Sequence, residues 1–444
     1  MTNKRVVLLV DDRKRDLNSL ALIAQHLKKQ GIDCYLQPLE AFRASLSAFK
    51  PHMIVFNHLV ASHLADFSQR MSQMGVKVGV LPNEGLMYDK EEMAYNAGRF
   101  HSNAHMDIFF CWHKAFKQAL EESGFGETTR LEVVGVPRFD LCFEPWVNIY
   151  ETAPPPEGEQ PLVLFCTRFV YAKYADMPPE AGDALFANWK DKISYYKDYW
   201  SIINGNHASR AKAMAYLKRL AESGKFRLIL RPHPREDLQF YLDFLAALPA
   251  DVAKRVSFDP DSPIAALIHR SDLVMTCEKC TTGLESWVVN RPTMTLVFDR
   301  HPMFYSDEHA QMDCICEDLD DVVAMTEAQM VDGAQANFEG ERHAHLKEWC
   351  GNLDGDSTEK IADLIAQTLQ GAPEPDWSQL TSRDRSRGWK LQLKNLFNHH
   401  YAHDYLLSIK RLFKRSAYHQ RWLTHTKTIR PSDVKQAKQL LDEL

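Results

Sequence analysis

Short apolar runs alternate with amphipathic stretches along the first third of the chain. The opening run, 6–10, is rich in β-branched residues, and apolar positions then recur at helical spacing from Leu17 to Leu27 until Gly31 ends the pattern. Further runs of strand length lie at 34–36, 53–56, 76–81, 108–112 and 131–134. Because helical patterns separate these runs and tight hairpin signals do not, they predict βαβ units and a parallel sheet.

A proline-rich polar segment, 152–161, interrupts this alternation and is typical of a domain boundary. Beyond it the pattern restarts. Strands are predicted at 162–166, 227–230, 255–258, 273–276 and 293–298, and helices at 208–222, 237–248, 262–269 and 282–289. The stretch 311–371 looks helical and acidic.

The sequence thus predicts an α/β protein with two Rossmann-like doubly wound domains, the architecture called GT-B, and a helical tail. We expect an N-terminal acceptor-side domain over 1–152, a C-terminal nucleotide-sugar-binding domain over 153–371, and a basic helical tail over 372–444. The length of 444 residues agrees with two hydrophobic cores, since one core rarely grows so large.

No window approaches the roughly 18 consecutive apolar residues of a membrane-spanning helix, and the short opening run is unlike a signal peptide. Nine cysteines, an odd number scattered through apolar runs, fit a reducing compartment. Cys277 and Cys280 have CxxC spacing, but Cys314 and Cys316 lie too close together for a second zinc knuckle. We therefore expect a cytoplasmic protein whose cysteines are buried thiols.

Charge is divided unevenly along the chain. The segment 383–444 carries 14 Lys/Arg against 5 Asp/Glu, a net +9, which leaves −15 for residues 1–382 of a chain whose net charge is −6. Within it Leu406, Ile409 and Phe413 alternate with basic residues, and Trp422 follows. Such a helix suits the anionic inner face of a membrane, or it packs back across the domains with its charges solvated. Nucleic acid is the weaker electrostatic partner, and we expect none.

Polar residues at the ends of the predicted strands are the candidates for chemistry. Arg231, His233 and Pro234 directly follow a strand, where a cation and an imidazole can bind phosphate; the plain alternative is a charged strand exit. Thr281 and Thr282 begin a helix after another strand, so its N–H groups, dipole and hydroxyls can hold a phosphate. The alternative is that these threonines only cap the helix.

Glu285 is placed one turn into that helix, where its carboxylate can reach a ribose. In the other domain Glu84 follows a strand and precedes Gly85. Gly85 permits a positive φ that would aim the carboxylate into a cleft as a general base; the alternative is a polar turn. Further strand ends contribute weaker candidates. They are Asp12 and Arg13, Asn57, Arg138 and Asp140, Thr167 and Arg168, and Thr276.

No metal site is expected. Asp259 and Asp261 have the spacing of a D-x-D motif, but the Ser-Pro-Ile that follows them is typical of a helix cap and first turn. The chain also lacks a G-x-G-x-x-G and a P-loop.

Taken together, several segments resemble one family. The chain resembles the bacterial surface-carbohydrate biosynthesis proteins. The resemblance lies in the opening 6–31, the Asn83-Glu84-Gly85 segment, the GVPRFD and RPHP segments and the run 261–286. These are similar to GT-B transferases that use CMP-activated Kdo or sialic acids, and to the CDP-glycerol glycerophosphotransferases. The resemblance covers about residues 4–300 and none of the tail.

The resemblance also implies roles for particular residues. An acidic-acidic-Gly motif supplies the catalytic carboxylate in the CMP-sugar transferases, and Glu84 is the carboxylate that matches it here. An HP motif contacts the CMP phosphate, which implies that role for His233 and Pro234, while helix-start hydroxyls correspond to Thr281 and Thr282. Cys280 stands where the family often has serine.

The leading hypothesis is a metal-independent glycosyltransferase that moves Kdo or a related ulosonic acid from CMP to a bacterial surface polysaccharide or its lipid-linked precursor. It needs no cofactor beyond the nucleotide-sugar donor. If the anomeric configuration is retained, a nucleophilic carboxylate is required, with Asp12 or Asp140 as candidates. The alternatives are a CDP-polyol transferase of the glycerol-phosphate type and a non-catalytic nucleotide-sugar-binding protein of the export machinery.

Overall fold

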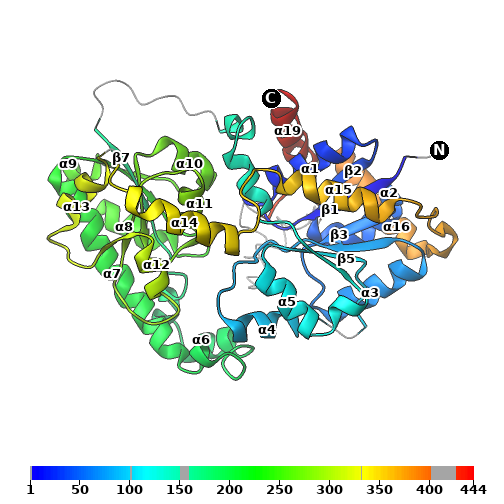
Figure 1. Ribbon diagram of the computed structural model, residues 1–444, viewed down its shortest axis with the longest axis horizontal. Helices are drawn as coiled ribbons and strands as arrows, with labels where there is room; N and C mark the ends of the chain where they lie inside the picture. The colour runs from blue at the N-terminus through cyan, green and yellow to red at the C-terminus, as the bar shows by residue number, and fades with distance from the viewer. Residues whose placement is uncertain (1–2, 101–102, 151–159, 332, 402–426) are drawn as a thin grey trace, which may run out of the picture. The chain divides into compact units, whose positions relative to one another are not determined.

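The computed structural model describes residues 3–100, 103–150, 160–331, 333–401 and 427–444 (Figure 1). The chain forms two compact units, one made of Met1–Ile149 with Lys347–Leu444 and the other of Tyr150–Leu346.

Unit 1 is built on a six-stranded parallel sheet in the order β2-β1-β3-β4-β5-β6. The strands are β1 (Arg5–Val10), β2 (Asp33–Pro38), β3 (Met53–Phe56), β4 (Lys77–Val80), β5 (Ile108–Cys111) and β6 (Arg130–Val133). The helices between them are α1 (Leu17–Lys29), α2 (Phe42–Phe49), α3 (Ser62–Gln73), α4 (Lys90–Ala97) and α5 (Lys114–Glu122). The strand order reverses between β1 and β3, so loops diverge there and leave room for a ligand beyond the strand ends.

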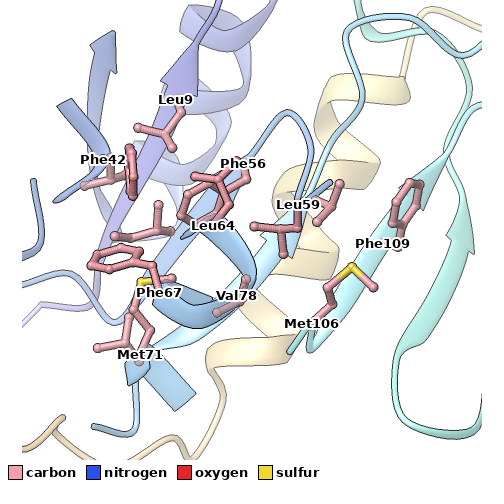
Figure 2. Packing of buried hydrophobic residues seen from close by; sticks show 14 of the residues in the cluster. Leu9, Phe42, Phe56, Leu59, Leu64, Phe67, Met71, Val78, Met106 and Phe109 are labelled. Atoms are coloured by element: carbon pink, nitrogen blue, oxygen red, sulfur yellow. The ribbon is translucent and has the colours of Figure 1, made fainter. Parts of the chain in front are cut away.

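Apolar side chains from the strands and from α2 and α3 fill the core on one face of this sheet. Phe42, Phe56 and Phe67 stack edge to face, and Leu64 and Met71 pack beside them (Figure 2). β3 and β5 are buried along their whole length, which explains why they read as unbroken apolar runs in the sequence.

Unit 2 has a second parallel sheet in the order β12-β11-β10-β7-β8-β9. The strands are β7 (Leu162–Cys166), β8 (Arg227–Arg231), β9 (Val256–Phe258), β10 (Leu273–Cys277), β11 (Thr293–Leu296) and β12 (Cys314–Cys316). The helices are α6 (Pro179–Phe186), α7 (Tyr199–Ser223), α8 (Leu238–Ala246), α9 (Ala250–Ala253), α10 (Ile264–Arg270), α11 (Thr281–Val288), α12 (Asp307–Gln311), α13 (Val322–Gln329) and α14 (Ala336–Trp349). Numbered within the unit, this is the dinucleotide-fold order 3-2-1-4-5-6, whose switch point lies between β7 and β10.

The C-terminal helices belong to unit 1. α15 (Ser357–Leu369) and α19 (Pro431–Asp442) pack on α1, and α16 (Ser382–Leu396) packs on α2 (Figure 1). Gly388 permits the approach of α16, because a Cβ there would lie 2.9 Å from the backbone nitrogen of Ala48. The buried Asp384 carboxylate accepts hydrogen bonds from the guanidinium of Arg70 at 2.6 and 3.2 Å.

The predicted fold class is confirmed: both units are doubly wound α/β sheets, and helices follow at the C-terminal end. The domain limits differ from those expected, because the contacts join residues 347–444 to unit 1, whereas the sequence placed 153–371 together and made a separate tail of 372–444. Strand β12 was not predicted. The expected amphipathic segment around Leu406 and Phe413, with Trp422, lies outside the described residues. In the described parts of the chain, no helix has the length and apolar character needed to cross a bilayer.

Candidate functional site

The switch point of unit 2 brings the loops after β7 and β10 together. Arg168 follows β7, and its guanidinium donates a hydrogen bond to the carbonyl oxygen of Lys279 in the loop after β10. This contact joins the two loops at the place where ligands bind in such sheets. The sequence predicted Arg168 as a weak candidate, and the strand order gives it a central position.

Helix α11 begins directly after this loop. Its N-cap residue is Cys280, whose side chain makes no capping hydrogen bond, and Thr281 and Thr282 are the first two helical residues. Among the described residues, no acceptor is bonded to the backbone N–H groups of these two threonines. The helix therefore starts as the sequence predicted, and its first N–H groups, with the positive end of the dipole, are available to an anion. Glu285 is buried one turn further on.

A buried carboxylate holds the loop of His233 in place. Glu236 Oε1 accepts hydrogen bonds from the His233 backbone N–H at 2.8 Å and from the Thr167 hydroxyl at 2.9 Å, and the Tyr241 hydroxyl donates to Oε2. Burial raises the pKa of Glu236, and these donors oppose that effect. Glu236 thereby ties the loop after β8 to the end of the neighbouring strand β7.

The same loop also orients the His233 ring. Its Nδ1 accepts the backbone N–H of Arg235 at 3.2 Å, which leaves the neutral ring with its proton on Nε2. Pro234 is exposed beside it. Arg231, at the end of β8, is mostly buried and donates to the Asp259 carbonyl at 3.1 Å, and burial lowers its pKa. Thr276 is fully buried and pairs with the Thr295 hydroxyl at 3.0 Å, so it lies within the sheet.

Glu278, which the sequence analysis did not single out, lies at the end of β10. Its carboxylate is fully buried, its backbone has φ of +63°, and no described residue gives either oxygen a hydrogen bond of ordinary geometry. Burial raises the pKa of Glu278 to about 7. The hydroxyl of Ser209 opposes this rise without cancelling it. Left-handed backbone at a non-glycine residue costs free energy and tends to occur at functional sites.

In unit 1, acidic residues surround one guanidinium beyond the strand ends. Arg15 donates to Glu84 Oε1 at 2.6 Å, to Asp16 Oδ1 at 2.6 Å and to Asp11 Oδ2 at 3.2 Å. Burial opposes the charge of Arg15, but the carboxylates of Asp16, Glu84 and Asp12 raise its pKa. The Glu84 side chain is 71% exposed, and Asp12 accepts the Arg15 backbone N–H at 3.2 Å. Glu84 is therefore an exposed carboxylate at the C-terminal edge of the sheet, held by a cation that the sequence analysis missed.

The expectation that Gly85 takes a positive φ is wrong, since its backbone is not among the left-handed glycines. Glycine is needed there for space: a Cβ would lie 2.6 to 2.9 Å from ring atoms of Trp112. The Gly85 carbonyl also contacts the His113 ring, with Nε2 at 2.9 Å. These contacts fix the Asn83-Glu84-Gly85 turn against the loop after β5.

The remaining candidates of unit 1 have structural partners. Asn57 donates through Nδ2 to the Asn83 side chain, and Arg138 lies 5.1 Å from the centre of the Trp112 ring. Arg13 pairs with Asp433 of α19 at 3.5 Å. Asp140 is buried, and its Oδ2 accepts the N–H of Thr358 at 2.6 Å, at the start of α15. Burial raises the pKa of Asp140 to about 6. In this arrangement Asp140 anchors α15, and its role as a nucleophile stays a prediction.

In the described residues, no three His, Cys, Asp or Glu side chains gather in a way that could hold a metal ion. Asp259 accepts hydrogen bonds from the backbone N–H groups of Asp261 and Ser262 in the turn before α10. The helix starts at Ile264 with Pro263 as its N-cap, so the expected cap at Ser262 is not found. None of the nine cysteines, all of which lie in the described residues, forms a disulfide.

Sequence reasoning missed Glu236, Glu278, Arg15 and Trp112. Glu236 stands two residues after the His-Pro pair, and an acid so close to a predicted phosphate loop was a usable signal. Arg15 has local partners in Asp11 and Asp16, but its contact with Glu84 joins distant segments, as does the contact of Trp112 with Gly85. No local pattern reveals these distant contacts.

Several solved structures resemble this chain in fold at low sequence identity. No family model matches the chain, and no curated protein matches it. A UDP-N-acetylglucosamine 2-epimerase structure has 12% identity and a TM-score of 0.49, and the match covers 84% of this chain and 97% of that one. The wall teichoic acid polymerase TagF with CDPG has 12% identity and a TM-score of 0.47, with 83% and 89% covered. Anabaena HepE with UDP and glucose has 13% identity and a TM-score of 0.41, with 83% and 100% covered.

Proposed function

We propose that this protein is a glycosyltransferase that uses a nucleotide-activated sugar, and that unit 2 binds the nucleotide. The observation that carries the proposal is the switch point between β7 and β10. There the start of α11 offers backbone N–H groups that no described residue uses, and Arg168 adds a cation. His233 comes from the adjacent strand end, on a loop that Glu236 fixes. This combination suits a phosphate more than any other ligand group.

The choice of donor rests on the resemblance seen in the sequence. Glu84 with Gly85, and His233 with Pro234, match motifs of transferases that use CMP-linked acidic sugars. We therefore favour Kdo or a related ulosonic acid as the sugar and a surface polysaccharide or its lipid-linked precursor as the acceptor.

In the proposed reaction, Glu84 accepts the proton of the attacking acceptor hydroxyl. The hydroxyl oxygen bonds to the anomeric carbon, and the bond from that carbon to the CMP phosphate oxygen breaks. The electron pair leaves on the phosphate, where the His233 Nε2–H and the N–H groups of α11 stabilise the negative charge. Glu84 must first separate from Arg15, which the exposure of its side chain allows.

The deciding experiment is incubation of the full chain with CMP-Kdo and, separately, with CDP-glycerol, followed by detection of released CMP. Release from CMP-Kdo that falls about 10²-fold in His233→Ala supports the proposal. Release from CDP-glycerol alone indicates a polyol-phosphate transferase. Tight binding of either donor without CMP release indicates a binding protein without catalysis.

We further propose that the basic C-terminal segment holds the protein at an anionic membrane surface. Trp389 and Leu396 on α16 and Phe397 at its C-cap have exposed fractions of 63, 76 and 59%. Lys390 and Arg385 of the same helix are also exposed. Large apolar side chains among cations suit the interface of anionic lipid, where each cation contributes about 1 kcal/mol. The chain should sediment with phosphatidylserine vesicles at low salt and release at high salt. Sedimentation that is unchanged in Trp389→Glu with Phe397→Glu would contradict the role of α16.

A further inference from the structure

A pocket in unit 1 lies beyond the strand ends at the reversal of the first sheet. The loops after β1, β3, β4 and β5 line it, and Asn57, Asn83, Trp112 and Arg138 are among its residues. The space is narrow, so it suits a slender group better than a flat aromatic base. No residue of unit 2 contributes to it.

Two polar atoms of this pocket lack partners. The Oδ1 of Asn57 and the Nε1–H of Trp112 are buried, and no described residue forms a hydrogen bond with either of them. Both side chains are more than nine-tenths buried. A buried polar atom without a partner costs about 1–3 kcal/mol, so proteins seldom keep such atoms unless a ligand or water satisfies them.

Their surroundings fix both side chains. The amide nitrogen of Asn57 is already bonded to the side chain of Asn83, which leaves the oxygen as the unused atom. Trp112 is confined between the backbone of Gly85 and the guanidinium of Arg138, 5.1 Å from the ring centre. Neither side chain can readily turn to a partner elsewhere.

One acceptor and one donor in the same pocket are complementary to a hydroxyl, which both donates and accepts. Of the charged side chains in the lining, Arg15 is paired with Asp16 at 2.6 Å and Arg138 lies over the Trp112 ring at 5.1 Å, and a hydroxyl satisfies both unpartnered atoms without carrying a charge. We propose that this pocket binds a hydroxyl-bearing arm of a sugar or polyol through Asn57 and Trp112. The inference rests on the proposed function, in which it is the acceptor-recognition site of unit 1.

The test is ligand binding, which requires no donor turnover. Saturation-transfer NMR on the full chain would use glycerol, D-glucose and D-galactose as probes. Trp112→Phe removes the N–H together with part of the indole and keeps an aromatic ring beside Arg138, and Asn57→Leu removes the acceptor, with the amide that bonds Asn83, in a side chain of the same branched shape. Trp377→Phe is the matched control, since Trp377 belongs to unit 1, lies outside the pocket and donates its Nε1–H to Glu374 at 2.9 Å. Thermal unfolding would verify that each variant is folded.

We expect at least one probe to bind saturably, with affinity about 5- to 10-fold weaker in either pocket variant and unchanged in the control. Absence of saturable binding by all three probes would mean that water alone fills the pocket, and it would overturn the inference. Equal binding by wild type and Trp112→Phe would overturn it as well. Because donor hydrolysis by unit 2 is measured separately, either failure would leave the proposed donor site standing.

Discussion

Replacement of Glu236 tests how the donor site is held together. Glu236→Ala removes the acceptor of three hydrogen bonds, from Thr167, His233 and Tyr241. A hydrogen bond to a charged group contributes about 1.5–3 kcal/mol, but removal of the carboxylate also ends the cost of burying a charge, which is several kcal/mol. The net loss in free energy of unfolding should therefore be about 2–4 kcal/mol, measured by urea denaturation. Tyr241→Phe removes one of the three donors and should cost only about 1 kcal/mol.

The same substitution should also lower donor turnover, because Glu236 acts on the donor only through the loop of His233. We expect CMP release to fall about 10²-fold in Glu236→Ala under conditions where the variant is folded. In the double variant with His233→Ala, the second change should add little, since both remove the same contact. Glu236→Gln retains an acceptor oxygen and should keep most of the activity. Fully additive losses in the double variant, or wild-type turnover in Glu236→Ala, would refute this account.

Three further changes test the rest of the structure. Gly85→Ala should destabilise the protein by about 1–3 kcal/mol because its Cβ meets Trp112. Gly340→Ala should instead stabilise it by about 0.5–1 kcal/mol, because Gly340 lies inside α14 with open space around it. Thermal unfolding distinguishes the two signs. Burial opposes the ionised form of Asp384, but its arginine partner and hydrogen bonds lower its pKa from 3.8 to about 2. The stability that Asp384 contributes is therefore present above pH 3.8 and is lost as the pH falls toward 2. Asp384→Asn should therefore cost about 2 kcal/mol at pH 6 and little near pH 2 in urea unfolding. Glu84→Gln should lower kcat for transfer by about 10²- to 10⁴-fold with little change in the donor KM, and normal kcat would exclude Glu84 as the base.

Much of each sheet could be predicted from local pattern. The apolar runs at 53–56 and 162–166 coincide with β3 and β7, because a strand covered on both faces must be apolar throughout. The start of α11 was equally readable, since the polar loop and small residues before Thr281 are typical of a helix start. Arg168 and His233 could be named as candidates because side chains that follow parallel strands collect at one edge of the sheet.

Tertiary structure decided the features that depend on residues far apart in the chain. Helix α1 looked like an amphipathic helix with one exposed face, yet Leu22 and Ile23 outside the predicted stripe are fully buried, because α15 and α19 return to cover it. The pairing of Glu236 with Thr167, and the contact of Gly85 with Trp112, likewise join separate segments. Hydrophobic pattern encodes the conformation of a segment and the face that it buries. It does not encode which distant segment covers that face. Contacts between distant segments therefore determined where the C-terminal helices pack and which polar groups meet at each sheet edge.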